Sequence, residues 1–287
     1  MPCFCIIPIG QIYRKCAKCG YLKKWVYFYA MERLSVITIC FNNLAEVQAT
    51  CASVDSQSVV PFEHYIIDGS SNTQIADWLQ NTPQPSYRKW VCEKDKGISD
   101  AFNKGIQRAE GTLIHLLNAA DIYYSNEVIE KVLACFEQQA QAQWISGNIY
   151  MNRGGHWVKV GVPFDKKQLY KGMRSVSHPT WFLRKEVYER AGLFNLDIKI
   201  AMDYDLLCRL TQEPYFYLNE TIVRFDDKGV STTQYLKSLL DNIKVYESHF
   251  GYSLKCRFWQ WRLKMIYYLM QTSFGKALYQ MKAAKLK

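Results

Sequence analysis

Short apolar runs alternate with longer segments of mixed polarity between residues 34 and 149. Runs of this length that are rich in Val, Ile and Leu are typical of buried strands in a parallel sheet. We predict strands at residues 34–40, 64–68, 89–92, 112–117 and 143–149. We predict helices at residues 44–56, 73–80, 97–109 and 126–139. Repeated strand–helix units indicate an α/β fold, a doubly wound and mostly parallel sheet with helices on both faces.

The alternation weakens after residue 150. A turn is predicted at residues 152–155, a short helix at 182–191 and a longer helix at 202–212. Beyond Ser231 the chain has helical character and ends in an aromatic, basic segment. We therefore expect a principal domain at residues 31–230 and a helical C-terminal region at 231–287.

The first 30 residues show no hydrophobic period. We expect Met31 to be the physiological start and residues 1–30 to lie outside the fold, because the first predicted strand follows directly. Two alternatives stay open for this segment, a membrane-surface role and a zinc site. The cysteines of that zinc site would be Cys3, Cys5, Cys16 and Cys19. No signal peptide or membrane-spanning helix is expected from the apolar stretches.

Charge is distributed unevenly along the chain. The net charge is +10, from 36 Lys and Arg against 26 Asp and Glu. Residues 1–30 contain five basic residues and residues 251–287 contain eight, and neither segment contains an acid. The segment between them is therefore mildly acidic, which argues against a nucleic-acid-binding surface. The scattered cysteines of this segment indicate a reduced, cytosolic protein.

Polar residues follow several of the predicted strands. Asp68 ends the second strand, and Asp121 follows the fourth. Ligands bind at the carboxyl ends of the strands in sheets of this kind. Asp68 could accept hydrogen bonds from a ligand or from its own turn, and Asp121 could bind a hard cation together with phosphates.

A dense polar segment surrounds the start of the predicted helix at 97–109. It contains Asp95, Asp100, Asn103 and Lys104, and the last three share one helix face. A helix N-terminus beside a lysine suits an anionic phosphate, although a capped and solvated surface helix has the same pattern.

Two further candidates lie in the second half of the chain. Asp203 and Asp205 occupy the first turn of a predicted amphipathic helix, where carboxylates are favoured by the helix dipole or can act as a general base. His178 lies in a loop, where a lone histidine is more often structural than catalytic.

The order of these motifs resembles that of family 2 glycosyltransferases with the GT-A fold, in particular the bacterial group that builds capsule, exopolysaccharide or O-antigen chains. The resemblance covers about residues 33–230. The matching segments are residues 35–42, 66–71, 95–105, 109–121 and 201–209.

The resemblance implies roles for individual residues. Asp68 is similar to the acid that reads the uracil of a UDP-sugar, and the main chain around Ile39–Phe41 would flank that base. The segment with Asp95, Asp100, Asn103 and Lys104 would complete the donor site. Asp121 matches the final acid of a metal motif for Mn²⁺ or Mg²⁺, and Asp203 matches the catalytic base. His178 resembles a family position near the acceptor or the diphosphate, and Asp205 would lie near the acceptor.

Two positions depart from the family pattern. Ala120 stands where the family usually has a second acid, which implies a weakened metal site. Met202 stands where the family has a glutamate before the base.

The resemblance implies an inverting transfer of a hexosyl or N-acetylhexosaminyl group from a UDP-sugar to a lipid-linked or growing polysaccharide acceptor. An inactive GT-A domain that acts as a scaffold and a nucleotidyltransferase are the alternatives. The basic, aromatic residues 251–287 predict a peripheral protein on the cytosolic face of the inner membrane, or else a helix packed on the domain. The oligomeric state is left open.

Overall fold

The computed structural model describes residues 11–15, 22–26, 32–153, 156–173, 176–225 and 234–275. Contacts divide the chain into two compact units, Met1–Glu32 and Arg33–Lys287. In the first unit, β1 (Gln11–Lys15) and β2 (Leu22–Val26) form an antiparallel pair with Gln11 opposite Val26. The expectation that no strand precedes residue 31 was therefore wrong. Strands of five residues are too short to show a clear period, although Ile, Tyr, Trp and Val favour extended pairing.

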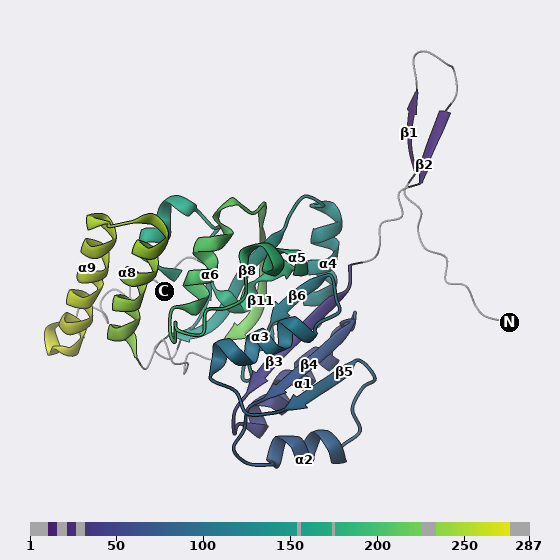
Figure 1. Ribbon diagram of the computed structural model, residues 1–287, viewed down its shortest axis with the longest axis horizontal. Coiled ribbons are helices and arrows are strands. Elements are labelled where there is room, and N and C mark those ends of the chain that lie inside the picture. The colour runs from purple at the N-terminus through teal and green to yellow at the C-terminus, as the bar shows by residue number, and fades with distance from the viewer. Residues whose placement is uncertain are drawn as a thin grey trace. The chain divides into compact units, whose positions relative to one another are not determined.

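The second unit is built on one nine-stranded sheet with the order β5-β4-β3-β6-β10-β8-β11-β7, and β9 pairs with β8. Neighbouring strands from β5 to β6 are parallel, as are β8 and β11, whereas β10 is antiparallel to both of its neighbours. Figure 1 shows this sheet with helices packed around it. The strands are β3 (Leu34–Cys40), β4 (Glu63–Asp68), β5 (Arg88–Cys92), β6 (Leu113–Leu116), β7 (Ile122–Tyr123), β8 (Trp144–Arg153), β9 (His156–Val160), β10 (Phe182–Arg184) and β11 (Tyr215–Phe225).

Helices and short 3₁₀ segments connect the strands. The helices are α1 (Leu44–Asp55), α2 (Gln74–Asn81), α3 (Ile98–Arg108), α4 (Val128–Gln138), α5 (Lys185–Ala191), α6 (Met202–Arg209), α8 (Tyr235–Phe250) and α9 (Leu254–Gln271). The 3₁₀ segments are η1 (Lys166–Lys171), η3 (His178–Thr180) and η4 (Leu210–Gln212). The described part of the chain contains no helix that is long and apolar enough to cross a membrane.

Hydrophobic residues of the sheet alternate between two core layers. Leu34 and Val36 of β3 pack with α4, whereas Ile37 packs in the layer that contains α3 and α6. Gly105 lets α3 approach the sheet closely, because a Cβ there would lie 2.4 Å from Cγ2 of Ile37. Helices therefore cover both faces, which confirms the predicted α/β fold class.

The prediction of one helix at residues 182–191 was wrong in its first part. Residues 182–184 form β10, and the helix α5 begins at Lys185. Phe182 pairs with His115 of β6 on one side and with Ile145 of β8 on the other. Burial between two strands therefore outweighs the local helical pattern.

The second half of the sheet was otherwise under-predicted. The strands β7, β9 and β11 were not expected. The register of β11 with β8 shifts between Tyr217 and Val223, which interrupts the alternation that would have revealed the strand. The predicted turn at 152–155 is in part the end of β8 at Arg153 and otherwise lies outside the described residues. The predicted helix at 202–212 is helical to Arg209 and continues as η4.

The last two helices pack on the rest of the second unit. α8 contacts α6, and α9 contacts both α8 and η1. Nε2 of His249 in α8 lies 2.8 Å from Oδ1 of Asp205 in α6. The C-terminal helices are therefore in direct contact with α6, the helix whose first turn contains Asp203.

Candidate active site

The carboxyl ends of β3 and β4 form the first part of the candidate site. Cys40 and Asp68, the last residues of these strands, are register partners. The Asp68 carboxylate is buried, and its Oδ1 accepts a hydrogen bond from the backbone N–H of Ser70 at 2.9 Å. Burial, together with the nearby Asp68, raises the pKa of the Cys40 thiol well above its usual range. Cys40 is therefore neutral beside the carboxylate.

The loops after β3 and β4 are joined by Asn42. Its backbone N–H donates to Ser70 Oγ at 2.8 Å, and its side-chain Oδ1 accepts from the backbone N–H of Ser71 at 3.0 Å. Asn42 has a φ of 54°, which asparagine tolerates better than most residues. In the sequence, Asn42 was recognised only as the last residue of the matching segment 35–42, and the tolerance of asparagine for a positive φ was the available signal for its role in joining the loops.

Ile39 and Phe41, which are predicted to flank the uracil ring of the donor, have different environments. Ile39 is partly buried and packs against the core that contains α3. The Phe41 side chain is 60% exposed beside the Asn42 loop. Phe41 directly follows Cys40, the register partner of Asp68, and an exposed aromatic ring at this position is suited to stack on a planar ligand.

Asp95 lies beside the Asp68 turn. A Cβ on Gly69 would lie 1.8 Å from Oδ2 of Asp95, so the carboxylate occupies the space that a side chain at position 69 would need. Oδ1 of Asp95 accepts from the backbone N–H of Gly97 at 2.8 Å. The structure therefore places Asp95 against Gly69, the residue that follows Asp68, and the shared role of the two carboxylates in a donor site stays a prediction.

The other polar residues of this segment stabilise its loops. Oδ2 of Asp100 accepts from the backbone N–H of Lys96 at 3.0 Å, and this bond, with Lys104 nearby, lowers the pKa of Asp100. Lys104 donates to the carbonyl of Lys94 at 2.8 Å. Asn103 both donates to and accepts from the backbone of Phe194, at 2.9 Å each. Their predicted contact with the donor stays a prediction.

Asp121 closes the loop that follows β6. Its carboxylate is buried and accepts from Asn118 Nδ2 at 3.3 Å, while its backbone carbonyl accepts from Thr50 at 2.9 Å. The backbone N–H of Ala119 donates to the carbonyl of Ile39 at 3.3 Å, so this loop lies at the end of β3. Ala120 has a φ of 81°, in the left-handed region where aspartate and asparagine are more frequent than alanine.

A metal ion at Asp121 would need ligands beyond the protein. Within the described residues, no group of three or more His, Cys, Asp and Glu side chains could hold a metal. One carboxylate nevertheless fits Mg²⁺ or Mn²⁺, because these ions retain waters and accept phosphate oxygens.

Asp203 lies in the first turn of α6, directly after Met202, the residue that contacts the start of α3. Ser99 Oγ is 2.8 Å from Sδ of Met202, so the N-termini of the two helices touch. Burial raises the pKa of Asp203 to about 6, although a hydrogen bond from the backbone N–H of Tyr204 at 2.8 Å favours the ionised form. A carboxylate with this pKa is ionised near neutral pH and is basic enough to take a proton.

Asp205 has a different environment from Asp203. Its Oδ2 accepts from Arg209 at 2.9 Å, and its Oδ1 lies 2.8 Å from Nε2 of His249. The buried carboxylate therefore has one partner for each oxygen, in α6 and in α8. The predicted acceptor role of Asp205 stays a prediction, but these contacts indicate a structural one.

His178 is buried among aromatic rings. Its ring centroid lies 5.0 Å from that of Trp181, 5.6 Å from that of Phe102 and 5.8 Å from that of Phe194. Burial lowers its pKa to about 4, so the imidazole is neutral at physiological pH. Phe102 belongs to α3, so His178 lies against the same helix whose start meets α6.

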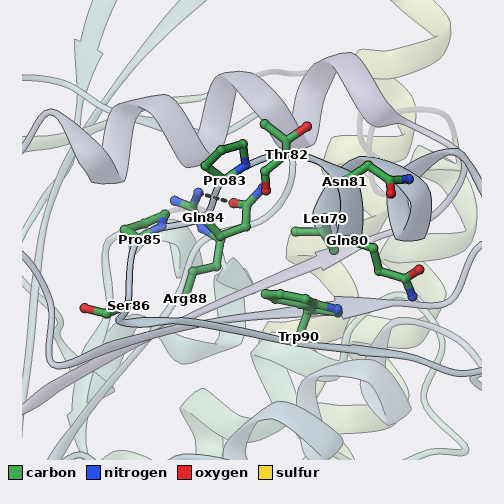
Figure 2. A pocket seen from close by; sticks show the side chains of 10 residues that line it. All are labelled: Leu79, Gln80, Asn81, Thr82, Pro83, Gln84, Pro85, Ser86, Arg88 and Trp90. Atoms are coloured by element: carbon green, nitrogen blue, oxygen red, sulfur yellow. Dashed lines mark hydrogen bonds between the residues drawn. The ribbon is translucent and has the colours of Figure 1, made fainter.

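A hollow in the surface is lined by other residues than those of the candidate site. It has a volume of about 570 Å³ and lies between the end of α2 and β5, as Figure 2 shows. Trp90 and Leu79 line it, and Arg88 donates to Gln84 at 2.9 Å. None of the predicted site residues lines this hollow, so we assign it no part in the chemistry.

The comparison with known proteins identifies the family. Residues 35–192, more than half of the chain, match the model of Glycosyl transferase family 2, and the chain belongs to this family. An uncharacterized glycosyltransferase of Mycobacterium tuberculosis is 30% identical over 204 residues, which cover 69% of this chain and 77% of the relative.

Solved structures show the same fold at low identity. The mannosyltransferase PcManGT from Pyrobaculum calidifontis, in complex with GDP-Man and Mn²⁺, has a TM-score of 0.59 and 13% identity, over 89% of this chain and 81% of that one. S. aureus TarS 1-349 in complex with UDP-GlcNAc has a TM-score of 0.55 and 15% identity, over 76% of this chain and 67% of that one. In a second S. aureus TarS structure, the match covers 40% of that chain. The predicted GT-A fold is confirmed.

Proposed function

We propose that this protein transfers a sugar from a UDP-sugar to a hydroxyl of a lipid-linked or growing polysaccharide acceptor, with inversion at the anomeric carbon and Asp203 as the base. The observation that supports the proposal most is the environment of Asp203. Asp203 follows Met202, which joins the N-termini of α3 and α6, and burial raises the pKa of the Asp203 carboxyl group to about 6.

The donor is proposed from the ends of β3 and β4. Asp68 would accept hydrogen bonds from the N–H edge of uracil, and the exposed ring of Phe41 would stack on the base. Asp95 adjoins the same turn. The complex of TarS with UDP-GlcNAc supports a uridine nucleotide by fold likeness alone.

The proposed transfer forms one bond, breaks one bond and moves one proton. The acceptor hydroxyl oxygen forms a bond to the anomeric carbon, and its proton passes to the Asp203 carboxylate. The bond from that carbon to the diphosphate oxygen breaks, and UDP leaves with the electron pair. Attack from the face opposite UDP would convert a UDP-α-sugar into a β-linked product.

We propose Mn²⁺ or Mg²⁺ as cofactor, held by Asp121 and the donor diphosphate. When bound, the ion would stabilise the negative charge on the leaving group. The Mn²⁺ in the PcManGT complex supports this choice. Ala120 leaves one carboxylate where the family usually has two, so we expect weak affinity for the free ion.

The second candidate function is an impaired domain that acts as a scaffold in glycan assembly. Ala120 and Met202 favour it, because each replaces an acid of the family pattern. We favour the enzyme, because neither replacement removes Asp203. We further propose a peripheral location on the cytosolic face of the inner membrane, where a lipid-linked acceptor would be reached.

Release of UDP distinguishes the two functions. Purified protein is incubated with UDP-glucose, UDP-galactose or UDP-GlcNAc, Mn²⁺ and a lipid extract from the producing cells, and UDP is measured by a coupled assay. Extract-dependent UDP release that is absent in Asp203→Asn is expected for the enzyme. Binding of UDP without any such release supports the scaffold instead.

A further inference from the structure

The helix α9 has an exposed apolar stripe on the side opposite its packed face. Cys256, Gln260 and Leu263 are buried against the rest of the unit. The opposite side presents six large side chains that are between 43% and 71% exposed. They are Leu254, Phe258, Trp261, Met265, Tyr268 and Leu269. Spacings of three, four and seven residues place them on a single stripe of the helix.

Basic residues border this stripe on both sides. On a helical projection, Arg257 and Lys264 lie along one border, and Lys255 and Arg262 lie along the other. α9 contains no acidic residue. An apolar stripe between two cationic borders is typical of helices that lie in the interface of a lipid bilayer.

One border extends into a cluster of three cations on two aromatic rings. Nζ of Lys255 lies 4.1 Å from the ring centroid of Tyr170, and Nζ of Lys171 lies 4.9 Å from that of Trp259. The Arg262 guanidinium lies 4.9 Å from the same Trp259 ring. We call Lys171, Lys255 and Arg262, with Tyr170 and Trp259, the cationic corner.

Within the part of the chain that the structure describes, no carboxylate forms an ion pair with the three cations of this corner. Arg257, on the opposite border of the stripe, differs from them because it forms an ion pair with Glu247 at 2.7 Å. Ammonium and guanidinium groups form charge-assisted hydrogen bonds with phosphate oxygens, and three of them gathered without a counter-ion suit a phosphate group.

We propose that the stripe and the cationic corner together bind an anionic phospholipid bilayer. The six apolar side chains would enter the boundary between headgroups and acyl chains, and Lys171, Lys255 and Arg262 would bind lipid phosphates. A second copy of the chain is a poorer occupant of a two-fold contact, because that contact would bring cations of both copies together. The inference deepens the proposed function, since it names the surface on which a lipid-linked acceptor would be met.

Binding of a bilayer to the stripe and the cationic corner would also orient α6, the helix that carries Asp203. α9 packs on α8, and α8 contacts α6 through the 2.8 Å contact between His249 and Asp205. Asp205 lies two residues after Asp203 in the same helix. A bilayer bound to α9 would therefore fix the direction from which a membrane-held acceptor approaches the base.

Vesicle flotation with the full chain tests the proposal. Vesicles of phosphatidylcholine alone are compared with vesicles that contain phosphatidylglycerol. The first variant combines Lys171→Gln, Lys255→Gln and Arg262→Gln, and the second combines Phe258→Asp with Trp261→Asp. The control combines Lys131→Gln, Lys159→Gln and Arg190→Gln, which removes the same charge from exposed residues of α4, β9 and α5.

We expect binding to the anionic vesicles only. Each cation near an anionic surface changes partitioning about fivefold, so the first variant should bind about a hundredfold more weakly. The second variant should lose binding, and the control should stay within about threefold of the wild type, because its charges lie outside the proposed surface. Equal loss in the control, unchanged binding by the first variant, or no binding of the wild type to anionic vesicles would overturn the proposal.

Two further measurements distinguish this surface from residues 276–287 and from a dimer contact. A chain that ends at Gly275 should still bind anionic vesicles. If this shortened chain loses binding while the Lys171/Lys255/Arg262 variant binds like the wild type, binding belongs to residues 276–287 instead. A dimer that the Phe258/Trp261 variant abolishes would assign the stripe to self-association. UDP-induced stabilisation without vesicles tests the proposed function separately, so the two proposals can fail independently.

Discussion

The Asp203→Asn variant separates the chemistry of the candidate base from its structural role. Asparagine keeps the shape of the side chain and an oxygen that can accept from the Tyr204 backbone N–H, a bond of 2.8 Å in the structure. It cannot take up the proton of the acceptor. Loss of a positioned base costs about 10²–10⁴ in rate, so turnover should fall by that factor while the affinity for UDP stays nearly unchanged.

The same substitution should stabilise the fold. The pKa of Asp203 is raised from 3.8 to about 6, so the folded state binds the proton more tightly than the unfolded state. The contribution of Asp203 to the free energy of unfolding is therefore fully present below pH 4, where the carboxyl group is protonated, and is lost as the pH rises through about 6. The Asp203 side chain is only partly buried in the structure, so solvent screening reduces this effect. The variant should be more stable than the wild type by about 1–2 kcal/mol at pH 7 and equal to it near pH 4.

The assay combines UDP release with denaturant unfolding at both pH values. The wild-type rate should also fall about tenfold between pH 7 and pH 5, as the carboxylate with a pKa of about 6 becomes protonated. Asp205→Asn is the matched control. It leaves Arg209 and His249 without their shared carboxylate, so it should lower stability by about 1–3 kcal/mol and affect turnover much less. Near-normal turnover in Asp203→Asn would refute the assignment and move the base to another group.

Three further predictions concern the donor, the metal and the N-terminus. Asp68→Asn should weaken UDP binding about tenfold or more in calorimetry, because a buried hydrogen-bond acceptor is replaced by an amide that presents a donor to the uracil ring. Unchanged affinity for UDP would show that Asp68 does not belong to the donor site. Ala120→Asp should tighten Mn²⁺ binding or raise activity at low Mn²⁺, since aspartate tolerates the φ of 81° at this position. The control Ala120→Gly should only relieve backbone strain. Full activity of the wild type in excess chelator would contradict the metal role. A chain that starts at Met31 should fold and keep its activity, because contacts separate Met1–Glu32 from the remainder, and insoluble expression would restore the zinc or membrane alternatives for residues 1–30.

The first half of the fold was predictable because local and tertiary preferences agree there. β3, β4 and β6 are short runs that the sheet buries almost completely, so their length and their Val, Ile and Leu residues identified them, whereas the edge strand β5 is about half exposed. The same pattern placed Asp68 at the end of a strand and Asp121 in the segment that follows one, and the structure has Asp68 as the last residue of β4 and Asp121 in the loop between β6 and β7.

The second half depends on contacts between residues that are distant in sequence. Phe182 is extended only because β6 and β8 flank it, and the irregular register of β11 conceals its period. The partners of Asp205 are four and 44 residues away, so its two hydrogen bonds could not be inferred from the first turn of a helix. The exposed stripe of α9 likewise became visible only when the packed face of that helix was known.

The configuration of the product tests the central claim most directly. A UDP-α-sugar that releases UDP in the assay above is supplied with the lipid extract, and the new anomeric proton of the isolated product is examined by NMR. An inverting transfer predicts UDP and a β-linked sugar in equal amounts. An α-linked product, or UDP with no new linkage, would contradict it.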